Sequence, residues 1–221
     1  LSYEELDQLA FELRAQMIAT TSRCGGHLAP SLGAVEIIIS LHRVLDCPKD
    51  KLVFDVGHQA YAHKLLTGRK DQFETLRTYG GISGFPKITE SEYDTHDSGH
   101  ASDSLSTALG YAYARDLDGS NARVAALIGD ASFTGVMALE ALNNIGHSHT
   151  NMVIVLNDNG MSISPNVGGF ASYLAKARMS DAYTMMRDSV EEAFNTRGGR
   201  LGRALMDAGN SVKESFKSLV L

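Results

Sequence analysis

Two short, continuous apolar runs, separated by a stretch of helical pattern, constrain the fold of this chain more than any other feature. The runs cover residues 124–128 (VAALI) and 152–156 (MVIVL). Unbroken apolar runs of this length are typical of strands that are buried on both faces. A strand, a helix and a second strand in this order predict a βαβ unit whose two strands run parallel. The residues between the runs have apolar side chains at roughly helical spacing: Val136, Leu139, Ala141, Leu142 and Ile145.

Polar residues follow both predicted strands at the point where each strand ends. Asp130 comes after the first run and its glycine, and Asn159 closes an Asn-Asp-Asn segment after the second. The carboxyl ends of parallel strands meet at one edge of a sheet, where open α/β sheets bind ligands, so we expect these two side chains to face one small volume. Carboxylate and carboxamide oxygens suit Mg²⁺ or Ca²⁺ and are poor ligands for zinc, and magnesium commonly takes further oxygens from a phosphate.

The helix between the two strands supports an anion site at the same place. We predict that it starts near Phe133 and stops at Gly146, so that its free amides and the positive end of its dipole point towards Asp130. His147 and His149 would then lie past the helix end, as structural residues. The alternative is that the polar residues at the strand ends only cap the elements that follow them. We favour the metal site because matched polar residues follow both strands.

The residues at these strand ends resemble a motif of thiamine diphosphate enzymes, in which GDG is followed after an interval by NDN or NN. Here Gly129-Asp130 is followed by Asn157-Asp158-Asn159. The resemblance covers about residues 6–177 and is only general beyond them. Four further segments narrow it to the 1-deoxy-D-xylulose-5-phosphate synthase family of the transketolase superfamily: DVGHQAY at 55–61, SEYD at 91–94, SGHA at 98–101 and NGMSIS at 159–164.

The resemblance implies an α/β fold with a mainly parallel sheet flanked by helices, of the kind that holds the pyrophosphate (PP) part of thiamine diphosphate. It implies that residues 1–221 are part of the amino-terminal domain, and that the pyrimidine-binding and carboxyl-terminal domains of the family are absent from this chain. By the same resemblance, the second domain would supply the glutamate that activates the cofactor. We therefore expect a truncated, proteolysed or naturally short form that is inactive alone.

For the whole enzyme, the resemblance implies a transferase that depends on thiamine diphosphate and Mg²⁺. Such an enzyme condenses pyruvate with D-glyceraldehyde 3-phosphate to form 1-deoxy-D-xylulose 5-phosphate and CO2. The product feeds the synthesis of isoprenoid, thiamine and pyridoxal precursors. The resemblance also implies that the enzyme is a homodimer.

The resemblance assigns roles to particular residues of this chain. Asp130 and Asn159 would hold Mg²⁺ through side-chain oxygens, and Met161 through its backbone carbonyl. His27 would line the substrate end of the pocket and take part in proton transfer, so His27 and His58 are the catalytic candidates. Contacts to the cofactor are implied for His58, Gly99, His100, Ala101, Ala131, Ser132 and Asn159.

One of these residues departs from the family pattern. Ala131 stands where the family usually has glycine, which gives GDA in place of GDG. Glycine is used where φ is positive or where a backbone must come close to a ligand, and alanine adds one methyl group. We predict that Ala131 keeps a negative φ and that it lowers cofactor affinity modestly, if at all.

Composition excludes several other classes of function. The 221 residues are 43% hydrophobic, which is enough for one sizeable core, and the net charge of −6 comes with no basic stripe for a nucleic acid. Cys24 and Cys47 are too few for a disulfide framework, and we interpret Cys24 as a lone buried thiol. No run approaches the length of a membrane span and no signal peptide is visible, so we expect a cytoplasmic protein with no membrane partner.

The same patterns divide the rest of the chain into elements. Ser2 and Glu5 form a capping box that opens a helix, whose apolar stripe includes Leu13 and Met17. Further elements are expected in chain order: a Gly/Pro loop at 24–33, a helix at 34–45, a strand at 52–54, helices at 60–66 and 71–77, a loop at 79–97, and helices at 103–115, 181–195 and 201–216.

Three alternative functions stay open at this point. The motifs also suit the amino-terminal subunit of a split transketolase that acts on ketose phosphates, although DVGHQAY and NGMSIS favour the synthase. A second alternative is a non-catalytic module that holds the cofactor or forms a dimer. A third is a Mg²⁺-dependent phosphohydrolase built on Asp130, for which Asp158 is the near candidate as a second carboxylate.

Overall fold

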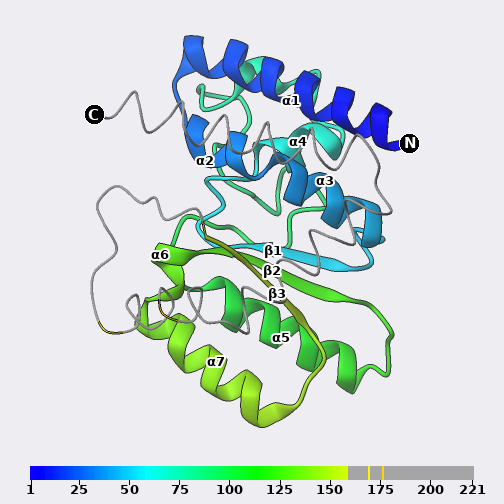
Figure 1. Ribbon diagram of the computed structural model, residues 1–221, viewed down its shortest axis with the longest axis vertical. Coiled ribbons are helices and arrows are strands. Elements are labelled where there is room, and N and C mark those ends of the chain that lie inside the picture. Colours follow the sequence, from blue (N-terminus) through cyan, green and yellow to red (C-terminus); the bar gives the residue numbers. More distant parts are fainter. Residues whose placement is uncertain (159–168, 170–175, 177–221) are drawn as a thin grey trace. The chain divides into compact units, whose positions relative to one another are not determined.

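The computed structural model describes residues 1–158, Gly169 and Lys176, and the fold below is that of the compact unit that begins at Asp7. Its centre is a parallel sheet of three strands, β1 (Lys51–Phe54), β2 (Val124–Gly129) and β3 (Val153–Asn157), in the order β1-β2-β3. Figure 1 shows α1 to α4 on one side of this sheet and α5 and α7 on the other. The predicted α/β class, with a parallel sheet flanked by helices, is confirmed.

The first helix, α1 (Tyr3–Cys24), begins as its sequence predicts. The backbone N–H of Glu5 donates to Ser2 Oγ at 3.2 Å, and the backbone N–H of Ser2 donates to Glu5 Oε2 at 2.6 Å. These two hydrogen bonds satisfy donors that a helix start leaves without partners. Leu13 and Met17, from the predicted apolar stripe, are buried.

The predicted loop at 24–33 is only partly a loop. Residues Leu28–Gly33 form a short helix, α2, and α3 (Val35–Val44) follows it as predicted. Pro30 explains the difference, because a proline is compatible with the first turn of a helix, where its missing N–H is not needed. Cys24 differs too, since its thiol is half-buried and donates to the carbonyl of Thr20.

The elements between the first two strands mostly follow the predicted pattern. After β1, α4 spans Tyr61–Leu66 and α5 spans Ser104–Leu117, with the predicted irregular loop between them. The predicted helix at 71–77 is only a single 3₁₀ turn, η1 (Phe73–Thr75), and Arg77 already has a left-handed φ of 60°.

The helix of the βαβ unit starts earlier than predicted and in two pieces. Four residues, Asp130–Phe133, form α6 directly after β2, and α7 spans Val136–Ser148. The break falls at Gly135, where an added Cβ would overlap the Ser102 hydroxyl. The predicted start near Phe133 is therefore wrong: the helix begins at Asp130, ends its first piece at Phe133 and resumes at Val136. The close approach of Ser102 to Gly135 explains the break.

The predicted end of this helix is also wrong. Gly146 lies inside α7, and the chain leaves the helix at His149, whose left-handed φ of 55° ends it. Glycine lowers helix stability by only about 1 kcal/mol, so it does not force a stop. His147 is consequently in the last turn of the helix, and only His149 lies past it.

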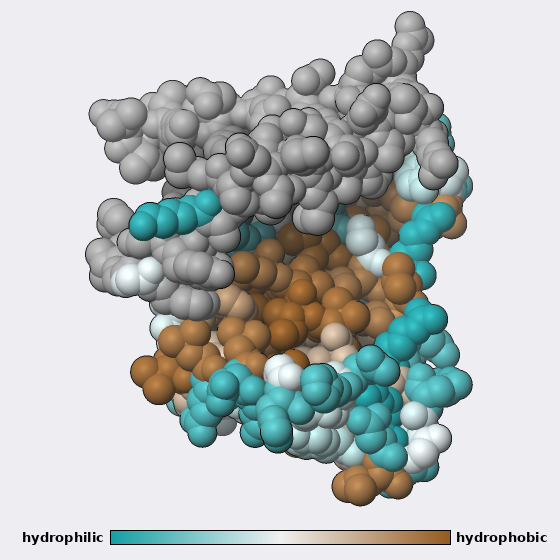
Figure 2. Space-filling view, turned by 60° about the horizontal axis from the view of Figure 1, so that its bottom comes forward, coloured by the Kyte–Doolittle hydropathy of each residue, from teal (hydrophilic) through white to brown (hydrophobic). Residues whose placement is uncertain are grey.

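The two predicted buried strands differ in burial. In β2 every residue before Gly129 is buried, as expected. In β3 no residue is fully buried and Val153 is 56% exposed, because β3 is the edge of the described sheet. Figure 2 shows hydrophobic residues gathered over one face of the molecule.

No helix among the described residues is both long and apolar enough for a membrane span. The predicted helices at 181–195 and 201–216 lie outside the described residues, as do Asn159 and Met161.

Candidate functional site

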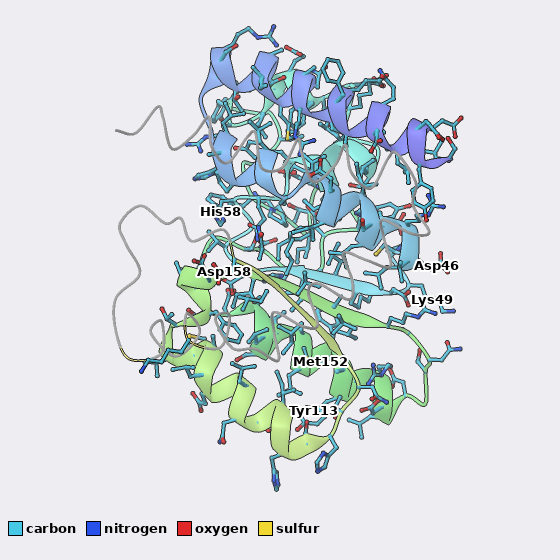
Figure 3. The ribbon with its side chains drawn as sticks, viewed as in Figure 1. Asp46, Lys49, His58, Tyr113, Met152 and Asp158 are labelled. Atoms are coloured by element: carbon cyan, nitrogen blue, oxygen red, sulfur yellow. The ribbon has the colours of Figure 1, made fainter. Side chains whose placement is uncertain are left out.

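The carboxyl edge of the sheet brings together the ends of β2 and β3, as predicted. The parallel register pairs Gly129 with Asn157, so Asp130 and Asp158 follow neighbouring strands at one edge. Asp130 is the first residue of α6 and is 6% exposed. Figure 3 shows His58 and Asp158 at this end of the sheet and Asp46 at the other.

Of the three predicted metal ligands, Asp130 is the one that lies within the described residues. Those residues contain no group of three His, Cys, Asp or Glu side chains that could hold a metal ion. The predicted set is of a different kind, with one carboxylate, one amide oxygen and one backbone carbonyl. The complete set at Asp130, Asn159 and Met161 therefore stays a prediction.

Asp55, at the end of β1, connects the sheet to the loop that carries His100. Its buried carboxylate accepts hydrogen bonds from the backbone N–H groups of Ser102 (2.9 Å) and Ser104 (3.2 Å) and from Ser104 Oγ (2.6 Å). Asp103, the residue before α5, makes no capping bond with its own side chain. Asp55 thus caps α5 from another element, and it fixes the 98–103 loop beside the end of β1.

The turn that carries His58 has an unusual backbone. Val56 and Gly57 both have left-handed φ values, 58° and 79°, and the Val56 N–H donates to the carbonyl of His100 at 3.1 Å. A β-branched residue in this region is a true outlier that costs about 1–3 kcal/mol. Gly57 is required, because a Cβ there would overlap Pro86 and Ser98. The surrounding contacts hold the strained turn in place.

The two predicted catalytic histidines, His27 and His58, lie next to each other. Their ring centroids are 5.9 Å apart, with an interplanar angle of 89°. The His27 N–H donates to the Tyr61 hydroxyl at 3.1 Å, and Ser31 Oγ donates to the carbonyl of His58 at 3.0 Å. Two backbone contacts therefore fix the positions of these residues.

The surroundings favour the neutral form of both imidazoles. Burial lowers the pKa of His27, and the charge of Arg77 lowers it further. Burial also lowers the pKa of His58, helped by His27 and opposed by Asp55 and Gln59. Neutral rings can accept a proton or a hydrogen bond near pH 7, so this geometry favours proton handling over a cationic phosphate site.

The 98–103 loop, which carries the predicted cofactor residues Gly99, His100 and Ala101, is also joined to α6. Ser102 Oγ donates to the backbone carbonyl of Ser132 at 2.7 Å. Gly99, His100 and Ala101 are exposed in this loop, and so is Ala131 in α6. Ala131 is helical and is not among the residues with positive φ, as predicted.

Phe85 and Pro86 also belong to the site, although no local sequence pattern points to them. The Phe85 ring lies 5.2 Å from the His27 ring, centroid to centroid. The carbonyl of Pro86 accepts a hydrogen bond from Ser98 N–H at 3.3 Å, and the Pro86 ring lies where a Gly57 side chain would be.

Orphaned polar atoms at this edge fit a polar ligand. Nδ1 of His27, Nδ1 of His58 and Oγ of Ser98 are buried without a hydrogen-bond partner in the described part of the chain. Buried polar atoms in proteins nearly always have a partner. These atoms, with the carboxylate of Asp130, are therefore suited to hold a cofactor that has both hydrogen-bonding groups and a metal-bound anionic end.

Comparisons with known proteins give one consistent result. All of residues 1–221 match the family model described as 1-deoxy-D-xylulose-5-phosphate synthase. The chain is 50% identical over 221 residues to the 1-deoxy-D-xylulose-5-phosphate synthase of Desulfitobacterium hafniense (strain DSM 10664 / DCB-2), and 52% identical over 221 residues to that of Carboxydothermus hydrogenoformans. It is 53% identical over 220 residues to 1-deoxy-D-xylulose-5-phosphate synthase 1 of Geobacter metallireducens.

The matches cover nearly all of this chain but a much smaller share of each relative. They include 100%, 100% and 99% of this chain, but only 35% of each of these relatives. The chain therefore spans about a third of the length of the curated relatives that it matches.

Proposed function

Because the chain belongs to the 1-deoxy-D-xylulose-5-phosphate synthase family, we propose that it grips the diphosphate end of thiamine diphosphate in such an enzyme. One observation supports this most strongly. Segments that carry His27, His58, His100 and Asp130 converge at the carboxyl edge of a single parallel sheet. This is the edge at which open α/β sheets bind their ligands.

The proposed metal site uses hard oxygen ligands. Asp130 and Asn159 contribute side-chain oxygens and Met161 its carbonyl, which is chemistry suited to Mg²⁺. A bound ion would anchor the diphosphate to these residues rather than act at the reacting carbon. When bound, thiamine diphosphate supplies the electron sink that the reaction needs.

The remaining residues position the cofactor and handle protons. The loop with Gly99, His100 and Ala101 and the backbone of Ala131 and Ser132 line the diphosphate end. His58 contacts the cofactor, and His27 lines the substrate end. Because burial lowers the pKa of both His27 and His58, each can accept a proton near neutral pH.

For the whole enzyme we propose a transketolase-type transferase reaction. Pyruvate and D-glyceraldehyde 3-phosphate are condensed to 1-deoxy-D-xylulose 5-phosphate with loss of CO2, in a Mg²⁺-dependent cytoplasmic homodimer. The similarity to 1-deoxy-D-xylulose-5-phosphate synthases favours this reaction over that of a split transketolase subunit. Product analysis of the enzyme that contains this chain tests the choice, since CO2 release without deoxyxylulose phosphate would contradict it.

Calorimetry tests the cofactor proposal on the chain itself. Thiamine diphosphate is titrated into the 221-residue chain with and without Mg²⁺. We expect binding that depends on Mg²⁺ and is weakened at least about tenfold in Asp130→Asn, because a charged ligand is lost. Asp158→Asn is the matched control, because it removes the same charge at the same edge.

Three results would contradict the proposal. They are no binding to the wild-type chain in the presence of Mg²⁺, equal affinities in the wild type and Asp130→Asn, and an equal loss in both variants. An equal loss in both variants is what a phosphohydrolase site with two carboxylates would give.

A further inference from the structure

Five ionisable side chains form a buried cluster between α4 and the irregular loop that follows it. His63, Lys64 and Arg69 come from α4 and the turn after it, while Glu90 and Asp94 come from the irregular loop that follows. The side chains of His63, Lys64 and Asp94 are 0% exposed, that of Arg69 is 5% exposed and that of Glu90 is 15% exposed. We call these five residues the clamp.

Asp94 is the more deeply buried acid of the clamp. Its carboxylate accepts hydrogen bonds from both terminal nitrogens of Arg69 (2.6 and 2.9 Å), from His63 Nε2 (2.9 Å) and from the backbone N–H of Lys87 (2.8 Å). Burial alone would raise its pKa, but the hydrogen bonds from His63, Arg69 and the Lys87 N–H hold the pKa of Asp94 well below its usual range. Asp94 is therefore a permanent anion with a full set of donors.

Glu90 is the second acid of the clamp. One of its oxygens accepts a hydrogen bond from Lys64 Nζ at 2.6 Å, and the other accepts one from the backbone N–H of Ser83 at 2.5 Å. Lys64 and Arg69 carry two positive charges against the two carboxylates. Because the charges of the clamp balance, it can stay buried, whereas the loss of one partner would leave an uncompensated charge.

The two backbone bonds of the clamp enclose a short segment. Ser83 N–H binds Glu90 and Lys87 N–H binds Asp94, so the residues between them, Gly84 to Pro86, are fixed from both sides. This segment has no helix or strand hydrogen bonds of its own. Besides the Phe85 N–H bond to Ser83 Oγ (3.1 Å) and the Ser98 N–H bond to the Pro86 carbonyl (3.3 Å), the two carboxylates are what fixes its ends.

The enclosed segment contacts three parts of the site. Phe85 packs against the ring of His27, and Pro86 lies against Gly57, the residue before His58. The Pro86 carbonyl also accepts the hydrogen bond from Ser98, at the start of the His100 loop. Through Phe85 and Pro86 the clamp thus reaches His27, the turn that carries His58 and the start of the His100 loop.

We propose that Glu90 and Asp94 are positioning residues, which hold Phe85 against His27 and Pro86 against Gly57, the residue before His58, and thereby set the surroundings of both imidazoles. The proposal rests on the proposed function, because that function makes the two rings important. Its test needs no cofactor, so its failure is distinguishable from a failure of cofactor binding.

The test follows the ring nitrogens of His27 and His58 by NMR during a pH titration of the 221-residue chain. In Asp94→Asn we expect shifted ring signals and higher pKa values for both histidines, because a loosened segment admits water. Asp50→Asn is the matched control. Asp50 is also a buried carboxylate and accepts two backbone hydrogen bonds, from Asp46 (2.9 Å) and Arg123 (2.7 Å), but it lies before β1, at the opposite end of the sheet.

Both variants should melt at a lower temperature than the wild type, and only Asp94→Asn should change the histidine signals. If Asp94→Asn does not fold, Arg69→Lys provides the same readout, because it keeps the charge but loses the bidentate bond. Wild-type histidine signals in a folded clamp variant would overturn the proposal. Equal changes in Asp50→Asn would overturn it too, because they would show a general effect of lost stability.

Discussion

Single residues with special backbone geometry shape this site more than local sequence patterns do. Val56 and Gly57 have left-handed φ values at the end of β1, where they turn the chain towards His58. The sequence indicates a turn through Gly57 but gives no sign that Val56 shares its conformation. Ala131 is the opposite case, since its negative φ could be predicted from the chemistry of alanine alone. Its small effect on cofactor affinity stays a prediction.

Gly57→Ala tests the close approach at this turn. The added Cβ meets the ring of Pro86 and the hydroxyl of Ser98, in addition to the strain of a φ of 79°, so we expect a loss of about 2–4 kcal/mol of unfolding free energy. Gly68→Ala is the control, because its φ of 86° is similar but nothing lies within 4 Å of the added Cβ, and about 1–2 kcal/mol is expected. Urea unfolding measures both, and equal losses would show that the contact with Pro86 is unimportant.

His42 should make the stability of the chain depend on pH. Its Nε2 lies 2.8 Å from Nδ1 of His63, and burial, with a smaller effect of His63, lowers its pKa from the ordinary 6.5 to about 4. Between pH 6.5 and 4 the unfolded chain binds this proton and the folded chain does not. The contribution of the neutral ring to stability is therefore complete above pH 6.5 and is lost as the pH falls towards 4.

The variant His42→Gln isolates this contribution, because glutamine keeps a donor for His63 and does not titrate. We expect its unfolding free energy to vary less between pH 4 and 6.5, by on the order of 1–2 kcal/mol, since the half-buried ring is partly screened by solvent. His27, His58 and His63 stay in the variant and keep their own pH dependence. Equal pH dependence of the wild type and His42→Gln in urea titrations would contradict the assignment.

At the scale of elements, the sequence predicts which elements exist better than it predicts where they end. The strands and the βαβ order follow from apolar runs, and the ends of both β2 and β3 lie where the pattern changes. The break of the helix at Gly135 depends on Ser102, which lies far away in the sequence. Pro30 indicated a loop but lies inside α2, because the first turn of a helix accepts proline.

The cap of α5 gives a test at this scale. The sequence places Asp103 at the helix start, whereas the bonds to the first turn come from Asp55 in a different element. Asp55→Ala should lower the unfolding free energy by about 2–4 kcal/mol, because it leaves buried donors of Ser102 and Ser104 without a partner. Asp103→Ala should cost less than about 1 kcal/mol. Thermal unfolding compares the two, and the reverse order would contradict the assignment.

At the scale of the whole molecule, the candidate site is assembled from segments that are distant in the sequence. The ends of β2 and β3 could be predicted to share an edge, because parallel strands end on the same side of a sheet. The contribution of Phe85, Pro86 and the clamp could not, because it depends on buried pairs such as Arg69 with Asp94 rather than on any local period. The chain spans about a third of the length of these relatives.

The central claim is that a divalent ion and a diphosphate bind at the carboxyl edge of this sheet beside Asp130. The most direct measurement is paramagnetic NMR of the chain with Mn²⁺ in place of Mg²⁺, in the presence of thiamine diphosphate. We predict strong broadening of the amide signals of Asp130 to Ser132 and of Gly99 to Ala101, with unchanged signals for Asp46 and Lys49 at the opposite end of β1. Equal broadening at both ends, or no broadening near Asp130, would contradict the claim.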